Sequence, residues 1–248
     1  MRRLLLDVDG SAVITLVVLF GCTADEADTK APADSAETGS ADSGDTADTG
    51  DTADTGDTGV TEVTYDPWPF VDAVVSYTPG VGAGYGQDGF PDVVCGPPEA
   101  PGDGGGSLDV LSFGDEGSIV VSFRSLDIID GVGPDLLVFE NAFVGWPETG
   151  VVAVSEDGVT WTEWPCDPED EPGGFPGCAG VALVYANSGN GVDATDPDAA
   201  GGDRFDLADI GVSRARFVRV RDSGANHYDG VSGGFDLDAM AVLNGVGW

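Results

Sequence analysis

Short apolar stretches with alternating polar positions recur along the chain from residue 67 onward, separated by Gly, Pro and Asp. Alternation of this kind places every second side chain on one face of an extended strand, and it differs from the 3.6-residue repeat of a helix. The predicted strands lie at 72–77, 118–123, 135–139, 151–155, 160–164, 181–185, 205–210, 215–221 and 235–243. Strands at this spacing with turn-rich connections predict an all-β fold, an antiparallel β-sandwich with jelly-roll topology.

Two local features of these strands carry further predictions. The sequence EDG at 156–158 lies between two strand patterns and predicts a tight hairpin turn, because Asp and Gly accept the positive φ angles that such a turn needs. Near the C-terminus, Asp206, Asp236 and Asp238 alternate with apolar residues. Since successive side chains of a strand point to opposite faces, we expect these three acids to face solvent, unless the end of the sandwich brings them near the calcium ligands.

The start of the chain follows the pattern of an export signal. Arg2 and Arg3 precede an apolar stretch at 12–20, which is too short to span a bilayer as a mature helix and is typical of a secretory signal. The stretch ends in LFGC at 19–22, which resembles the lipobox of bacterial lipoproteins. This resemblance implies cleavage before Cys22 and a diacylglycerol group on its sulfur. The alternative is that Cys22 is an apolar thiol in an ordinary signal or anchor.

The anchor also predicts where the protein resides. Acyl chains on one cysteine hold a protein at a membrane almost permanently. Thr23, directly after Cys22, resembles the residue at this position in lipoproteins that are sent to the outer membrane. We therefore expect an extracytoplasmic protein of the cell envelope, at the outer membrane or cell surface, whose partner is the membrane through the lipid anchor.

A polar linker follows the predicted lipidation site. Residues 23–62 consist mainly of Asp, Thr, Ala, Gly and Ser, and they include Asp-Thr-Ala and Asp-Thr-Gly triplets at 45–59. A segment of this composition buries too little apolar area to offset its ordering, so we expect a disordered acidic spacer. A glycosylated or calcium-condensing stalk is the alternative. The predicted organisation is a lipoprotein signal peptide (1–22), this linker (23–62) and one β-sandwich domain (63–248).

Charge restricts the partners of the domain. The chain has 45 Asp and Glu against 9 Lys and Arg, and its net charge is −36. From residue 60 onward, 32 acids face 6 arginines, which leaves −26 on the part predicted to fold. Such a surface repels phosphate backbones, so we expect no nucleic-acid partner. Divalent cations, calcium above all outside the cytoplasm, would relieve the self-repulsion.

Candidate metal ligands are concentrated around one predicted strand and a later loop. Asp130 and Asp135 flank a glycine-bearing turn, in which carboxylates and backbone carbonyls can converge on a hard cation. Glu140 is an acid within an apolar strand, and a buried acid needs a metal, an arginine or backbone amides as its partner. The predicted calcium ligands are Asp130, Asp135, Glu140, Asp203 and Asp206. The alternative is that these acids are ordinary turn and cap carboxylates, and that the acidic loop at 193–203 is simply solvated.

Several motifs in this region together resemble one family. DGVGPDLLVFEN lies at 130–141, SEDGVTW at 155–161, GGDRFDL at 201–207 and GFDLDA at 234–239. In this order they resemble a family of bacterial cell-surface proteins whose domains are relatives of the galactose-binding-like, discoidin-type jelly rolls. The resemblance implies the jelly-roll fold and a surface location, and it implies no particular reaction.

The remaining cysteines predict one disulfide. Cys166 and Cys178 flank a loop of Pro, Gly and acidic residues that could not hold a shape by itself, and an exported protein can oxidise them. We expect Cys95 to be unpaired, as a small apolar residue in the CGPP turn at 95–98. The alternative is that Cys95 pairs in place of one of the other two.

Residues that could carry catalysis are scarce, and aromatic side chains are the better indication of a ligand. His227 is the sole histidine, and no serine lies in a nucleophile-elbow motif. Aromatic rings can stack on sugars, so Trp146, Tyr185 and the neighbouring Asn141 are the predicted ligand-binding residues, whereas Trp161 is expected in the core.

These patterns together predict a non-catalytic cell-surface lipoprotein, not an enzyme. Its calcium-stabilised β-sandwich would act as a binding or adhesion module, with a glycan or another surface protein as partner. One alternative is a carbohydrate-binding protein of a surface glycan uptake system. The other is a glycoside hydrolase that uses two carboxylates.

Overall fold

A computed structural model of the chain describes residues 5–6, 12–13, 20–22, 68–103, 105–141, 143–226 and 233–247. The predicted linker and most of the predicted signal peptide lie outside these residues. The strands are β1 (Leu5–Leu6), β2 (Ala12–Val13), β3 (Phe20–Gly21), β4 (Ala73–Thr78), β5 (Leu111–Ser112), β6 (Ser118–Ser122), β7 (Leu126–Ile129), β8 (Leu136–Glu140), β9 (Gly150–Ser155), β10 (Thr162–Glu163), β11 (Asp203–Phe205), β12 (Arg214–Ala215), β13 (Phe217–Asp222), β14 (Asp236–Val242) and β15 (Gly245–Gly247). The helical segments are the 3-10 turns η1 (Gln87–Gly89), η2 (Asp92–Val94), η3 (Glu171–Gly173) and η4 (Leu207–Ile210).

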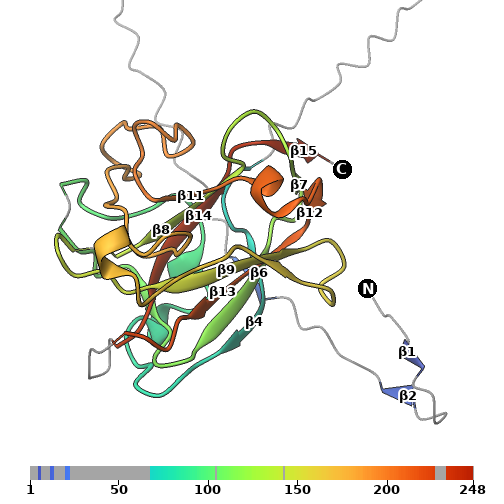
Figure 1. The fold of residues 1–248 in the computed structure, drawn as a ribbon, viewed down its shortest axis with the longest axis horizontal. Helices are drawn as coiled ribbons and strands as arrows, with labels where there is room; N and C mark the ends of the chain where they lie inside the picture. Colours follow the sequence, from blue (N-terminus) through green and yellow to red (C-terminus); the bar gives the residue numbers. More distant parts are fainter. Residues whose placement is uncertain are drawn as a thin grey trace, which may run out of the picture. The chain divides into compact units, whose positions relative to one another are not determined.

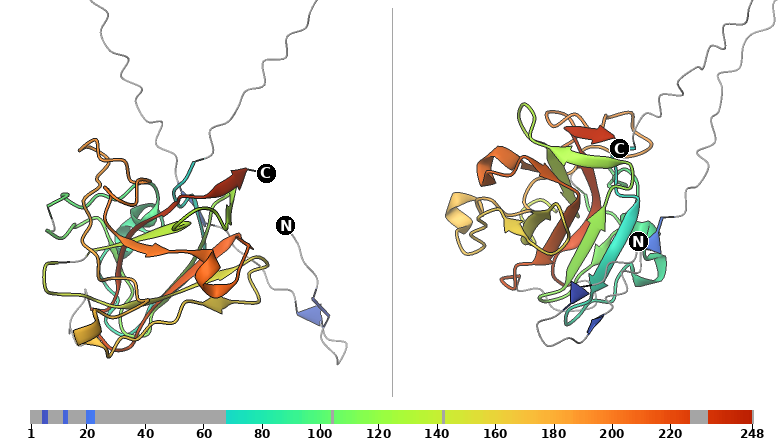
Figure 2. Two further views of the ribbon diagram at one scale, coloured as in Figure 1. Left: turned by 45° about the horizontal axis from the view of Figure 1, so that its top comes forward. Right: turned by 90° about the vertical axis from the view of Figure 1, so that its right-hand side faces the viewer.

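Two antiparallel sheets form the layers of a sandwich (Figures 1 and 2). One sheet has the strand order β10-β9-β13-β6-β4-β3, and the other has the order β11-β8-β14-β5. A small third sheet, β12-β7-β15, brings the C-terminal strand beside β7. The prediction of an all-β antiparallel sandwich is therefore confirmed. Among the described residues, no helix has the length and apolar character needed to cross a membrane.

The sheet that contains β8 is buried on both faces. Along β8, Leu136 and Val138 pack in the larger core between the two sheets. Leu137 and Phe139 point the other way, into a second cluster that is closed by loop residues such as Val184. This double burial explains why the strand reads as a continuous apolar run and does not alternate.

The same double burial corrects the prediction for the acids of β14. Asp236 and Asp238 are buried and do not face solvent, because loops cover the outer face of their sheet. Asp238 accepts hydrogen bonds from the backbone amides of Glu99 (3.0 Å) and Ala100 (3.1 Å). It therefore ties one covering loop to the sheet.

Other strand predictions fail where side chains bond to nearby backbone. The predicted strand at 205–210 ends at Phe205 and continues as η4, because the Asp206 side chain accepts a hydrogen bond from the Ala208 amide and caps that turn. The predicted strand at 181–185 is wrong, since this stretch forms only an isolated bridge between Val184 and Gly201. In contrast, the hairpin at 156–158 is confirmed.

Asp157 and Gly158 stabilise the hairpin turn that their sequence predicts. Asp157 Oδ1 accepts hydrogen bonds from the backbone amides of Val159 and Thr160, both at 2.8 Å. Gly158 adopts a φ of 74°, which a side chain would disfavour. These bonds join β9 to β10.

Two disulfides occur among the described residues. Cys166 pairs with Cys178, as predicted. Cys95 pairs with Cys22, so the expectation that Cys95 is unpaired is wrong for this structure. The strand β3, which precedes Cys22, pairs with β4, and that pairing brings the two sulfurs together.

Candidate metal centre

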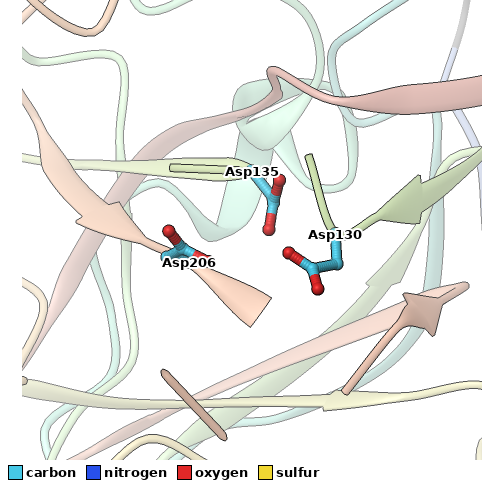
Figure 3. Close-up of side chains that lie close together, drawn as sticks. All are labelled: Asp130, Asp135 and Asp206. Carbon is cyan, nitrogen blue, oxygen red and sulfur yellow. The ribbon is translucent and has the colours of Figure 1, made fainter. Parts of the chain in front are cut away.

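Three aspartates converge at one end of β8, two from the turn before this strand and one from the residue after β11, and we refer to Asp130, Asp135 and Asp206 as the aspartate triad. Each offers a carboxylate oxygen, and these oxygens lie within 4.8 Å of one another (Figure 3). The strand register brings them together, because Phe205 pairs with Leu136 and so sets Asp206 beside Asp135. Asp130 directly follows β7 and is held by a hydrogen bond from its amide to the Ser213 carbonyl (3.1 Å).

The carboxylate of Asp135 is fixed by three donors. Its Oδ1 accepts hydrogen bonds from the Gly131 amide and from Asn244 Nδ2, both at 2.9 Å, and its Oδ2 accepts one from the Leu207 amide at 2.8 Å. A Cβ atom on Gly131 would lie 2.3 Å from the Asn244 side chain, so a larger residue would displace this donor to Asp135. The turn is therefore built around a buried, oriented carboxylate.

The donor set of the triad fits a hard divalent cation. Carboxylate oxygens are the ligands that calcium prefers, and the triad supplies oxygens from three of them. Asp130 is exposed and Asp206 is half-buried, so an ion could reach both from solvent, while buried Asp135 forms the floor. Asp135 Oδ2 and Asp206 each retain acceptor capacity, because each oxygen of a carboxylate can accept more than one bond.

The structure does not bring all five predicted metal ligands together. Asp135 precedes β8 and Glu140 ends it, so the two are about 16 Å apart at the usual rise of an extended strand. Asp203 lies opposite Val138, and its carboxylate accepts hydrogen bonds from the amides of Gly180 and Ala182 at 2.7 and 3.1 Å, as well as from Val181. Glu140 and Asp203 thus belong to a different part of the sandwich from the triad.

A second set of acids gathers where β8 ends, and we call Glu140, Glu148, Asp203 and Asp236 the Glu140 group. Glu140 pairs with Leu237 of β14 and shares its face with Val138, which places its side chain on the core side of the sheet. It is 1% exposed, and neither carboxylate oxygen makes a hydrogen bond of regular geometry. Burial raises the pKa of Glu140 well above its usual range, and the nearby charges of Asp236, Glu148 and Asp203 raise it further, against a weaker opposing effect of the Asp236 backbone amide.

Burial also raises the pKa of the other acids in this region. The pKa of Glu148 rises to about 8 through burial and the charges of Asp236 and Asp222. Burial raises the pKa of Asp203 and of Asp236 to about 6, although hydrogen bonds oppose the rise in both. The pKa of Asp238 rises to about 7 for the same reason.

No arginine compensates the Glu140 group. The part of the chain from residue 68 to 247 contains six arginines and no lysine, and every one of these arginines forms an ion pair elsewhere. Their acidic partners are Asp72, Asp127, Asp198 and Glu163. His227 lies outside the described residues.

The predicted ligand-binding residues have different surroundings. Trp146 is 53% exposed and Tyr185 is 45% exposed, so both rings can meet a ligand. Asn141 is buried, and its side-chain oxygen accepts a hydrogen bond from the Ser107 amide, so it serves the fold. Trp161 is half-buried beneath Arg219, whose guanidinium carbon lies 4.7 Å from the ring centre. The expectation that Trp161 lies in the core is therefore wrong.

The acidic loop before β11 is organised by local bonds. Asp193 accepts hydrogen bonds from the amide and the hydroxyl of Thr195, at 2.8 and 2.7 Å. Asp196 accepts one from the Asp198 amide at 2.9 Å. These local hydrogen bonds give Asp193 and Asp196 a role in shaping the loop that requires no bound ligand.

Comparison with known proteins adds no assignment: no protein-family model matches the sequence, and no curated protein matches it.

Proposed function

We propose that this protein is an extracytoplasmic, non-catalytic lipoprotein whose β-sandwich is a calcium-stabilised binding or adhesion module. The convergence of the aspartate triad is the observation that carries the proposal. A domain with a charge of −26 gains stability from a bound cation, because the cation offsets repulsion among its acids. Asp130, Asp135 and Asp206 would hold the ion, and Gly131 keeps the turn compact enough for them to do so.

Calcium should therefore raise the thermal stability of the full chain through the triad. At a concentration 100-fold above its dissociation constant, one ion adds about 2.7 kcal/mol, or roughly 5–10 °C in Tm for a domain of this size. Replacement of two ligands, Asp130→Asn with Asp206→Asn, should remove that gain, and Asn at 206 can still cap η4. Calorimetry in calcium and in EDTA measures the difference.

Asp209→Asn is the matched control, because Asp209 is exposed in η4 beside the triad and is not one of its members. This control should gain as much from calcium as the parent. A double variant that gained the full increment would refute the role of the triad.

The sulfur of Cys22 is the atom that would carry the lipid anchor. A thioether to diacylglycerol and the disulfide to Cys95 use the same atom, so one molecule cannot contain both. We propose that the mature protein is the acylated form, in which the Cys22 sulfur carries the lipid and makes no bond to Cys95. The disulfide between Cys166 and Cys178 supports an oxidising, extracytoplasmic compartment in either case.

A carbohydrate ligand is the second candidate, and the exposed rings of Trp146 and Tyr185 favour it. Stacking of a sugar on these rings should be lost when both are replaced by Ala. A glycan array probed with the full chain should show binding that the double Ala variant lacks, with Val159→Ala, another exposed apolar position, as control. Equal binding by parent and variant would place any glycan site elsewhere.

A further inference from the structure

The outer face of the six-stranded sheet carries two arginines that the proposed function does not use. Val218 and Val220 of β13 pack in the core between the sheets. Arg219 and Arg221 alternate with them and therefore project from the opposite face, across which β9, β13, β6 and β4 lie side by side (Figure 1). Their side chains are 27% and 42% exposed, so a ligand in solution can reach both.

The strand register surrounds these arginines with short side chains. Residues directly opposite each other in an antiparallel pair project from the same face of the sheet. The residues in register with the two arginines are Val151 and Ala153 of β9, Val120 and Ser118 of β6, and, one strand further, Ser76 and Thr78 of β4. The arginines therefore stand on a shallow floor, which carries three hydroxyl groups.

One carboxylate serves both arginines. Glu163 Oε1 lies 2.8 Å from Arg219 Nη2 and 3.8 Å from Arg221 Nε. The second distance is too long for a hydrogen bond, and Arg221 forms no ion pair with another acid among the described residues. Two positive charges thus share one negative charge, which leaves an excess of one positive charge on this face.

Arg219 is held in a defined orientation. Its guanidinium carbon lies 4.7 Å from the centre of the Trp161 ring, within the range of a cation–π interaction. Its hydrogen bond to Glu163 restrains the same group. Because the guanidinium group is already positioned, less side-chain entropy is lost when a ligand binds to it.

The other arginines of the described chain are committed to acids of their own. Asp127 accepts four hydrogen bonds from Arg214 and Arg216 and is buried between them. Arg124 and Arg204 each form an ion pair with a separate aspartate. Among the described residues, the two arginines on the outer face are therefore the cations best placed to bind an additional anion.

We propose that Arg219, Arg221 and the hydroxyl-bearing floor beside them bind a glycan that carries carboxylate groups. A guanidinium group binds a carboxylate through two parallel N–H donors, and the floor offers hydroxyls to the sugar ring. A uronic acid brings one charge per sugar, whereas an acidic protein or a nucleic acid would bring many charges to a domain of −26. The site rests on the proposal that the domain is a binding module, and it uses neither the aspartate triad nor the rings of Trp146 and Tyr185.

Isothermal titration of the full chain with tetragalacturonic acid, in buffer freed of divalent cations, tests this site. Arg221→Gln should weaken binding about tenfold, since a charge-assisted contact is lost. Glu163→Gln should tighten binding, because it removes the carboxylate that competes for both arginines. Arg204→Gln is the matched control, since it removes the same charge from an exposed ion pair elsewhere, and it should bind as the parent does.

Several results would overturn the site. They are no binding of tetragalacturonic acid by the parent, equal binding of its uncharged methyl ester, and equal weakening by Arg221→Gln and Arg204→Gln. Weaker binding by Glu163→Gln than by the parent would count against it as well. Circular dichroism shows whether Arg221→Gln folds; should it not, Arg219→Gln takes its place and must produce the same tenfold loss.

A further variant separates this site from the function proposed above. Replacement of Trp146 and Tyr185 by Ala should leave the binding of tetragalacturonic acid unchanged. Loss of binding in that variant would refute the arginine site and support a carbohydrate site at the two rings. The effect of calcium on thermal stability is measured without any glycan, so its failure is distinguishable from the failure of the arginine site.

Discussion

In buffer without divalent cations, the free energy of unfolding of the full chain should fall steadily as the pH rises from about 5 to about 8. The acids responsible are buried, and their pKa values lie near 6 for Asp203 and Asp236, near 7 for Asp238 and near 8 for Glu148. Burial also raises the pKa of Glu140. In the unfolded chain the same groups titrate near pH 4.

The direction follows from proton binding. Between the unfolded and folded pKa values, the folded protein holds more protons than the unfolded chain, so a rise in pH favours unfolding. Each additional proton held by the folded state changes the free energy of unfolding by about 1.4 kcal/mol per pH unit. The contribution of each acid is complete below pH 4 and is lost as the pH passes its folded pKa.

Urea unfolding in EDTA at several pH values between 4.5 and 8 measures this trend. A curve that is flat or rises between pH 5 and 8 would show that these acids are not buried as described. The measurement needs no glycan or partner protein, so its result depends on the folded chain alone.

Replacement of Asp127 by Asn should cost about 2–3 kcal/mol of unfolding free energy at neutral pH. The buried carboxylate of Asp127 accepts hydrogen bonds from Arg214 Nε at 2.7 Å and from Arg216 Nε at 2.8 Å. Burial alone would raise the pKa of Asp127, but the hydrogen bonds from Arg216 and Arg214 outweigh it and lower the pKa. The side-chain NH2 group of Asn would face one of the arginine N–H groups, and the ion pairs of Asp127 with Arg214 and Arg216 would be lost, leaving only backbone pairing between β7 and β12.

The expected loss is below that of a fully buried pair because both arginines are partly exposed. Asp198→Asn is the control, since Asp198 forms an exposed ion pair with Arg204, and it should cost less than about 0.5 kcal/mol. Urea unfolding at pH 7 compares the two. Equal stability of the two variants would contradict the structural role of Asp127.

The strands that could be predicted from the sequence are those with an apolar run or a regular alternation. The stretches of β8, β9 and β14 are mostly apolar, and β13 alternates apolar residues with arginine. The strand β7 was missed because it is short and contains Asp127, whose burial depends on two arginines distant in sequence. Local polarity cannot reveal such a partner.

The triad was predictable in part, and the Glu140 group was not. Asp130 and Asp135 are close in sequence and flank a recognisable turn, whereas the register of β11 against β8 decides that Asp206 joins them and Asp203 does not. Glu140 stands out as an acid in an apolar strand. Glu148 precedes β9 and Asp236 begins β14, so the effect of their charges on Glu140 depends on the folded sheets.

The pairing of Cys22 with Cys95 escaped prediction for a chemical reason. The sequence around Cys22 resembles a lipobox, which assigns the sulfur to a lipid and leaves Cys95 without a partner. The fold adds that β3 can pair with β4 and carry Cys22 to Cys95 when the sulfur is free. A thioether on Cys22 therefore marks the lipid-anchored protein, whereas a disulfide to Cys95 marks a protein without that anchor.

Mass spectrometry of the mature protein isolated from the cell envelope tests the proposed anchoring directly. We expect an N-terminal peptide that begins at Cys22 with a diacylglycerol group on its sulfur and no bond between Cys22 and Cys95. A chain that retains residues 1–21, or a peptide in which Cys22 is joined to Cys95, would contradict this expectation.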